Sequence, residues 1–191
     1  MRIVGGRFRG RPLATPSDEA TRPTSDRVRE AIFNILEHGI CDLALPGARV
    51  LDLFAGTGAL GLEALSRGAA FCLLVEEEAE GRALIRRNVE ALGLTGVTKI
   101  FRRDATELGP AGRNGEFSLA FLDPPYGQGL AERALASAAA GGWLAAGAVA
   151  VVEERKGAAV ALPGGFTALD RRIWGDTQAL FARFAAGESR T

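Results

Sequence analysis

Short apolar runs alternate with amphipathic segments between residues 48 and 155. The apolar runs are nearly continuous, as expected for strands that are covered on both faces of a sheet. They lie within residues 48–56, 71–76, 97–104, 117–123 and 147–155. The intervening segments with helical spacing are residues 59–68, 78–93 and 129–144. We therefore expect an α/β protein with a mostly parallel sheet that helices cover on both sides.

Two more strands are expected near the end of the chain, over residues 167–176 and 178–185. Gly175 and Asp176 provide a tight turn between them. This hairpin predicts that an antiparallel strand completes the otherwise parallel sheet.

The first forty residues have a different pattern from the rest of the chain. Residues 1–13 mix short apolar pieces with Gly and Arg, which predicts a small β-hairpin or a basic arm, and residues 14–24 form a loop rich in Pro, Thr and Ser. Residues 25–39 place their apolar side chains on one face of a helix that Gly39 can end. We therefore divide the chain into an N-terminal extension, residues 1–40, and a main domain, residues 41–191.

The composition suits a globular protein of 191 residues with a single main domain. No apolar run reaches the ~18–20 residues that a membrane helix needs. Charged residues stand where a signal peptide would have its apolar segment. The two cysteines are too few for a disulfide framework and lack the spacing of a zinc site. We expect a cytoplasmic protein, monomeric and without a bound metal.

Positive charge is concentrated at the start of the chain, although the net charge of the whole protein is zero. Residues 1–29 contain seven arginines and three acids. Arginine is well suited to contacts with nucleic-acid phosphates. The arginines expected to contact RNA are Arg7, Arg9, Arg11, Arg22, Arg27 and Arg29.

A glycine-rich loop follows the first strand of the main domain. Gly56, Gly58 and Gly61 match G-x-G-x-x-G, and Glu76 lies 20 residues after Gly56. That spacing is typical of dinucleotide-binding folds, so an NAD-dependent dehydrogenase is one alternative. Asp52 counts against it, because it stands inside the strand where a nicotinamide fold has apolar residues.

Acidic residues stand at the ends of three successive predicted strands, where ligands of open α/β sheets bind. Asp52 suits a cationic amino acid head group, Glu76 can accept hydrogen bonds from two ribose hydroxyls, and Asp104 can accept one from an adenine amino group. S-adenosylmethionine contains all three groups. Asp104 taken alone fits a turn or helix cap equally well. The predicted cofactor-binding residues are Asp52, Phe54, Ala55, Gly56, Thr57, Gly58, Glu76, Asp104 and Ala105.

The fourth strand of the main domain ends in the sequence AFLDPPYG, residues 120–127. Asp123 and a main-chain carbonyl, that of Pro124, can accept the two N–H bonds of a nucleobase amine. Pro124 and Pro125 restrict the backbone and remove its donors, which leaves a rigid set of acceptors. Tyr126 offers a ring on which the base can stack. We therefore predict that Asp123, Pro124, Pro125 and Tyr126 form the catalytic site.

These motifs together resemble a known family. Four motifs are similar to those of the class I S-adenosylmethionine-dependent methyltransferases that modify exocyclic amines. They are DLFAGTGALGLEALSRG, VEEE, RRDA and FLDPPY. RIVGGRFRGRPL, TRPTSDRVREAIFNIL and WGDTQALFARF narrow the resemblance to the bacterial guanine-N2 methyltransferases of 16S ribosomal RNA, the RsmD family.

This resemblance implies a Rossmann-like fold with a seven-stranded sheet, in which the terminal strand is inserted antiparallel. It implies cofactor contacts from the glycine loop, Glu76 and the region of Asp104, and catalysis by Asp123 through Tyr126. It also implies that the N-terminal arm and residues 21–30 face the RNA or close over the cofactor. The partner would be ribosomal RNA, either free or within a partly assembled small ribosomal subunit.

Two further alternatives remain open on the sequence alone. The same chemistry could act on a DNA adenine or a protein glutamine amide, although such enzymes commonly have Asn where this chain has Asp123. The chain could also be an RNA-binding protein that has kept a cofactor fold without catalysis.

Overall fold

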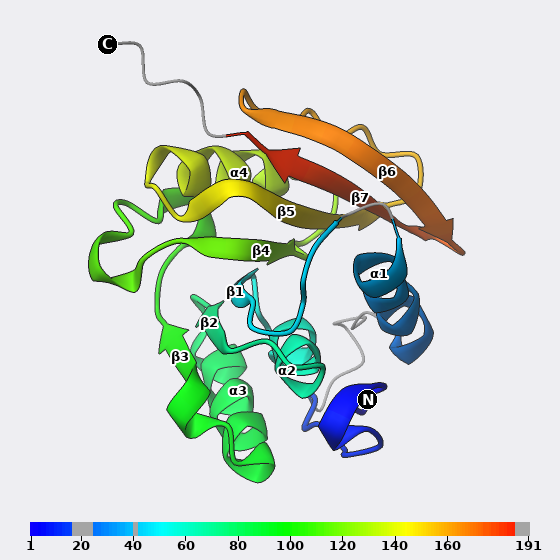
Figure 1. Cartoon of the computed structure of the whole chain (residues 1–191), viewed down its shortest axis with the longest axis vertical. Coiled ribbons are helices and arrows are strands. Elements are labelled where there is room, and N and C mark those ends of the chain that lie inside the picture. Colours follow the sequence, from blue (N-terminus) through cyan, green and yellow to red (C-terminus); the bar gives the residue numbers. More distant parts are fainter. Residues whose placement is uncertain (17–24, 40–41, 186–191) are drawn as a thin grey trace.

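The computed structural model describes residues 1–16, 25–39 and 42–185. Within them, seven strands form one sheet in the order β3-β2-β1-β4-β5-β7-β6 (Figure 1). The first five strands pair in parallel, whereas β7 lies between β5 and β6 and is antiparallel to both. The strands are β1 Arg49–Leu53, β2 Phe71–Val75, β3 Thr98–Phe101, β4 Phe117–Leu122, β5 Leu144–Arg155, β6 Phe166–Trp174 and β7 Thr177–Phe184.

Helices cover both faces of the sheet, as the apolar runs predict. One buried cluster joins α1, α2 and α3 to one face, and a second joins α4 to the other. The helices are α1 Asp26–His38, α2 Ala59–Ser66, α3 Ala79–Leu92 and α4 Leu130–Ala140. Short 3-10 turns lie at Gly6–Phe8, Thr95–Val97, Ala105–Glu107 and Gly112–Asn114. None of the helices in the described part of the chain is long and apolar enough to span a membrane.

The sequence therefore predicted the fold class, the strand order along the chain and the terminal hairpin correctly. One boundary was wrong: the helix expected over residues 129–144 ends at Ala140. Gly142 has a φ of +71°, which a helix cannot continue through. The buried Trp143 then leads directly into β5.

The N-terminal residues form a closed loop that packs against the main domain. Its ends pair through an antiparallel bridge between Arg2 and Pro12, so the predicted hairpin is reduced to a single bridge. Ile3 and Leu13 belong to the same buried cluster as α1 and α2. The boundary expected at residue 40 falls outside the described residues, and the division into two parts stays a prediction.

The register of the parallel strands determines where the candidate site forms. Leu53 of β1 pairs with both Val75 of β2 and Leu122 of β4, and Leu122 pairs with Val152 of β5. These residues form one row across the sheet. The residues that follow Leu53, Val75 and Leu122 therefore leave the sheet side by side; they are Phe54, Glu76 and Asp123, and β5 continues past them with Glu153.

Candidate active site

The glycine loop after β1 contains backbone in an unusual conformation. Phe54 has a φ of +61°, and Gly56 and Gly58 have φ values of +57° and +79°. For a residue with a side chain, such as Phe54, this left-handed conformation costs about 1–3 kcal/mol and is concentrated at functional sites. The loop is tied to β2 by the Ala55 N–H, which donates to the Val75 carbonyl at 3.0 Å.

The third glycine of the fingerprint has a packing role. A Cβ at Gly61 would lie 2.5 Å from Cys72 Sγ and 3.0 Å from Asp52 Oδ2. Only a glycine lets α2 approach the sheet this closely. The G-x-G-x-x-G spacing in this chain is therefore explained by a tight turn and close helix–strand contact, without any dinucleotide.

Asp52 is buried beneath this loop, with 2% of its surface exposed. Its Oδ2 accepts a hydrogen bond from the Gly61 N–H of α2 at 2.9 Å. Burial above all raises the pKa of Asp52 to about 7; the Gly61 N–H opposes this effect, and the carboxylates of Asp123 and Glu76 add to it. The sequence placed Asp52 facing the crevice, and the structure shows that one of its oxygens instead holds α2 in place.

Glu76 contacts the glycine loop directly. Its Oε2 accepts from the Gly56 N–H and its Oε1 from the Glu78 N–H, both at 2.8 Å. A Cβ at Gly81 would lie 2.8 Å from Glu76 Cγ and Cδ, so Gly81 leaves room for this side chain under α3. The predicted ribose acceptor is thus half-buried and adjacent to the loop.

Asp104 caps a short turn after β3. Its Oδ1 accepts from both the backbone N–H and the hydroxyl of Thr106, each at 2.8 Å. Ala105, the next residue, is buried. The structure thus shows the capping role that the sequence left open for Asp104, and its contact with an adenine stays a prediction.

The residues of the turn after β4 differ in how far they are exposed to solvent. Asp123 is half-buried, Pro124 is buried, Pro125 is exposed, and Tyr126 is 38% exposed. The Tyr126 hydroxyl lies 3.5 Å from Thr177 Oγ1 of β7. Partial burial, together with the nearby carboxylates of Asp123, Glu153 and Glu154, raises the pKa of the Tyr126 phenol, although the Thr177 contact opposes the shift. A neutral ring therefore stands beside a carboxylate.

Two site residues were missed by the sequence analysis. Glu154 of β5 is 7% exposed, and both of its oxygens lie 3.2 Å from the Gly127 N–H, so it holds the end of the turn that follows β4. Thr177 meets Tyr126 from β7. The signal for Glu154 was present, because the run VVEER ends a buried strand in acids, as LLVE and FLD do.

The predicted RNA contacts divide into two groups. Arg7, Arg9 and Arg11 are exposed on the N-terminal loop, and Arg27 is exposed on α1. Arg11 Nη2 donates to the Ala91 carbonyl of α3 at 2.9 Å. Arg22 lies outside the described residues.

Arg29 was wrongly expected to contact RNA. It is fully buried: its Nη2 lies 2.8 Å from Asp26 Oδ1 and donates to the Arg2 carbonyl, and its Nε lies 3.5 Å from Glu63 Oε2. A guanidinium enclosed in this way cannot reach a phosphate. Its position on the apolar stripe of α1, three residues before Ile32, was a signal for burial.

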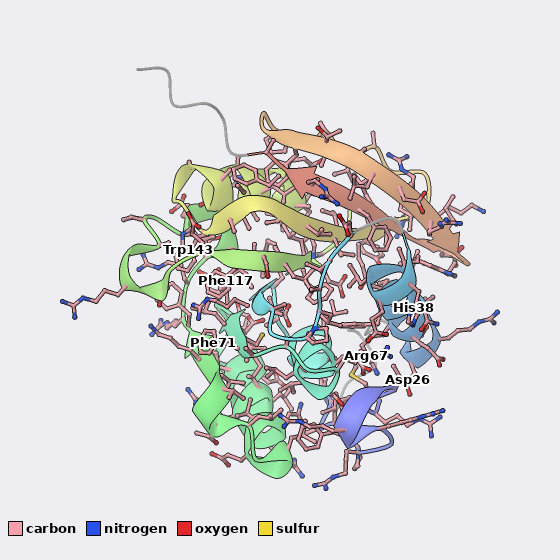
Figure 2. The ribbon with its side chains drawn as sticks, in the orientation of Figure 1. Asp26, His38, Arg67, Phe71, Phe117 and Trp143 are labelled. Carbon is pink, nitrogen blue, oxygen red and sulfur yellow. The ribbon has the colours of Figure 1, made fainter. Side chains whose placement is uncertain are left out.

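Glu63 joins the N-terminal loop to α2 and α1. Its carboxylate accepts from the N–H groups of Val4 and Gly5 at 2.8 and 2.7 Å, and it lies 2.9 Å from Arg67 Nε. Arg67 also pairs with Glu37 of α1 at 2.7 Å. Figure 2 shows Arg67 near Asp26 and His38, beside α1. The loop that carries three exposed arginines is therefore fixed to the helix that follows the glycine loop.

The site as a whole can hold a cationic ligand. Asp52, Asp123 and Glu76 lie close enough to shift one pKa, and they would repel a pyrophosphate. Within the described ranges, no group of three or more His, Cys, Asp or Glu residues is arranged to bind a metal ion. The arrangement can therefore bind a positively charged cofactor and orient an amine beside it.

Comparisons with known proteins agree with this geometry. Residues 1–183 match the family model described as "Conserved hypothetical protein 95". The chain is 37% identical over 191 residues to Ribosomal RNA small subunit methyltransferase D of Escherichia coli (strain K12), covering 99% of this chain and 93% of the relative.

Solved structures show the same fold. The Escherichia coli protein yhhF superposes with a TM-score of 0.81 at 31% identity, covering 97% of this chain and 98% of that chain. A second structure is the 16S rRNA N2 G1207 methyltransferase RsmC of Thermus thermophilus, solved in complex with AdoMet and guanosine. It has a TM-score of 0.63 at 24% identity, and the match covers 88% of this chain and 44% of that chain. The chain belongs to the family of ribosomal RNA small subunit methyltransferase D.

Proposed function

We propose that this protein transfers a methyl group from S-adenosylmethionine to the exocyclic N2 amine of a guanine in 16S ribosomal RNA. The observation that carries the proposal is the register of the sheet, which brings the Asp123–Tyr126 turn beside the glycine loop in a chain of this family. The substrate is ribosomal RNA, free or within a partly assembled small subunit, and the enzyme acts as a cytoplasmic monomer.

The residues at the site fit this cofactor. Its sulfonium and amino groups are cationic, and the carboxylates of Asp52, Glu76 and Asp123 form an acidic environment. Glu76 can accept a hydrogen bond from a ribose hydroxyl in addition to those from its backbone partners, because a carboxylate oxygen accepts more than one hydrogen bond. When bound, S-adenosylmethionine supplies an electrophilic methyl group.

The catalytic turn orients the guanine amine. Its lone pair is delocalised into the ring, so the amine needs help to face a methyl donor. The Asp123 carboxylate and the Pro124 carbonyl accept its two N–H bonds and direct the lone pair toward the methyl group. Orientation of this kind can lower the activation free energy by up to ~7–11 kcal/mol. The nitrogen would take the methyl group as the S–CH3 bond of the sulfonium breaks and neutral S-adenosylhomocysteine is left. It would then release one proton, which the Asp123 carboxylate can accept.

Tyr126 holds the base outside its stack. Extruding a base costs a few kcal/mol, and stacking on one aromatic ring returns about 1–3 kcal/mol. The exposure of Tyr126, at 38%, makes its ring accessible to a base. Replacing Tyr126 by Phe keeps this function, whereas replacing it by Ala removes it.

The N-terminal extension, residues 1–40, guides the RNA to the main domain, residues 41–191. Arg7, Arg9, Arg11 and Arg27 are exposed and contact phosphates. Each phosphate contact that is removed reduces the salt dependence of binding by a slope of about 1. An unchanged slope for the Arg7→Gln/Arg9→Gln double variant would reject this role.

The decisive experiment is mass-spectrometric mapping of ribosomal RNA after incubation with the protein and labelled S-adenosylmethionine. We expect N2-methylguanosine with the wild type and a yield reduced by about 10²–10³-fold at equal incubation time with Asp123→Ala. Glu116→Ala is the matched control, because Glu116 is an exposed acid that precedes the opposite end of β4. Methylation of a DNA adenine or a protein amide instead, or binding of NAD without S-adenosylmethionine in calorimetric titration, would contradict the proposal.

A further inference from the structure

Asn88 of α3 joins two segments that are distant in the sequence. The residue is 2% exposed. Its Nδ2 donates to the Thr57 carbonyl at 2.9 Å and to the Ala14 carbonyl at 3.1 Å, and its Oδ1 accepts from the Ala14 N–H at 2.7 Å. Both of its donors and its oxygen are therefore used, and the identity of the partners fixes the orientation of the amide.

One segment lies at the proposed cofactor site and the other at the proposed RNA-binding loop. Thr57 lies in the glycine loop, between the left-handed Gly56 and Gly58. Ala14 lies just after the N-terminal loop, which carries the exposed Arg7, Arg9 and Arg11. A hydrogen bond to each means that neither backbone segment can move far without affecting the other.

Other contacts reinforce the same connection. The Thr57 hydroxyl lies 3.7 Å from Met1 Sδ, so the glycine loop touches the first residue of the N-terminal loop as well. Leu13 donates through its N–H to the Met1 carbonyl at 3.1 Å. Arg11 reaches the Ala91 carbonyl, three residues beyond Asn88 on the same helix. The N-terminal loop is thus attached to both α3 and the glycine loop.

We propose that Asn88 is a positioning residue that couples RNA binding at the N-terminal loop to cofactor binding at the glycine loop, so that each ligand strengthens the binding of the other. The inference rests on the proposed function. A cofactor that orders Thr57 also orders Ala14 through Asn88, and the reverse holds for RNA. Thermodynamic linkage requires the two enhancements to be equal.

The test measures the affinity for S-adenosylhomocysteine with and without a 16S ribosomal RNA fragment, and the affinity for RNA with and without S-adenosylhomocysteine. In the wild type we expect both affinities to rise by the same factor, within the range of about 5–150-fold that is typical of such coupling. Asn88→Leu keeps the branched shape of the side chain but has no hydrogen-bonding groups, and Asn88→Asp lacks the two donors. Both variants should bring the factor close to 1.

Asn114→Leu is the matched control. The Asn114 amide also donates to a backbone carbonyl, that of Ala111, at 2.9 Å, but in the loop before β4. It should keep the wild-type coupling factor. A role of Asn88 in stability alone would weaken the binding of each ligand but leave the ratio unchanged, and that result would overturn the inference.

A measurement on the unmutated protein covers the case in which the Asn88 variants do not fold. The Ala14 amide hydrogen should exchange about 5-fold or more slowly once S-adenosylhomocysteine is bound, because its acceptor is held by the ordered loop. Unchanged exchange, or independent binding of the two ligands, would overturn the coupling while leaving methyl transfer intact. Failure of the wild type to bind S-adenosylhomocysteine at all would instead refute the proposed function.

Discussion

The two ends of the parallel strands contain different kinds of residue. At the amino ends, the buried Phe117 stacks on Trp143 with ring centroids 6.2 Å apart, and Phe71 lies 6.4 Å from Phe117. Arg49 lies over the rings of Phe71 and Phe117 at 4.8 and 4.9 Å. Figure 2 shows Phe71, Phe117 and Trp143 grouped together, away from Asp26, His38 and Arg67.

The carboxyl ends carry poorly solvated acids and strained backbone instead. Asp52 is buried with a raised pKa, Phe54 adopts a left-handed conformation, and Tyr126 leaves much of its ring exposed. Every one of these features lowers stability, whereas the aromatic cluster at the other end raises it. The comparison indicates that the sheet separates stability from function along the length of its strands.

The largest effect on stability is expected from a substitution in the aromatic cluster at the amino ends of the strands. Trp143→Ala removes a fully buried ring and the hydrogen bond from its Nε1 to the Gly109 carbonyl, at 2.7 Å. The free energy of unfolding should fall by about 3–5 kcal/mol, measured by chemical denaturation. Methyl transfer per folded molecule should stay within about twofold of the wild type, if binding and orientation depend on the opposite end alone.

Removal of Asp123 should have the reverse pattern. In Asp123→Ala, the amine loses one of its two acceptors, and the single-turnover rate should fall by about 10²–10³-fold, the usual loss for one preorganised hydrogen bond. The free energy of unfolding should change by less than about 1 kcal/mol. A variant that is unstable but fully active would show that the two ends are not separated.

The buried acid Asp52 should make the free energy of unfolding depend on pH. Because its pKa is raised from 3.8 to about 7 in the folded protein, the folded state holds a proton that the unfolded state has lost. The Asp52 contribution to stability is therefore complete below about pH 4 and is lost as the pH rises to about 7. Between pH 5 and pH 7 the free energy of unfolding should fall by roughly 2 kcal/mol from this group.

Asp52→Asn should remove this part of the pH dependence, because an amide does not titrate in this range. The measurement is denaturation of both proteins at a series of pH values. Parallel curves for the two proteins would contradict the raised pKa.

Glu154 should give the smallest effect. Glu154→Leu removes the acceptor of the Gly127 N–H, a loss worth about 1 kcal/mol. The single-turnover rate should fall about 5-fold, with little change in cofactor affinity. Glu154→Gln keeps an acceptor oxygen and should restore most of the rate; equal losses in both variants would assign Glu154 a role through its charge.

The pattern of apolar residues was sufficient for most of the fold, because β1, β2, β4 and most of β5 are buried on both faces. The helices α1, α3 and α4 are each buried on one face. Asp123 and Glu76 could be predicted for the same reason, since they directly follow buried strands. Arg29 was placed wrongly although its position on the apolar stripe of α1 indicated burial, because the sequence does not show that Glu63 of α2 faces it. Asn88 was missed because its partners are backbone atoms, which have no signature in the sequence. Glu154 was missed although its place at the end of a buried strand was a signal.

The position of β7 between β5 and β6 has a consequence for how the protein is made. During synthesis β6 emerges first, yet its only neighbour in the described sheet is β7, which emerges later. Until then, β5 exposes an unpaired edge that other chains can join. Thr177, which meets Tyr126, also arrives with β7. Until residue 184 has left the ribosome, the nascent chain therefore lacks the partner of Tyr126 and exposes an edge that favours aggregation.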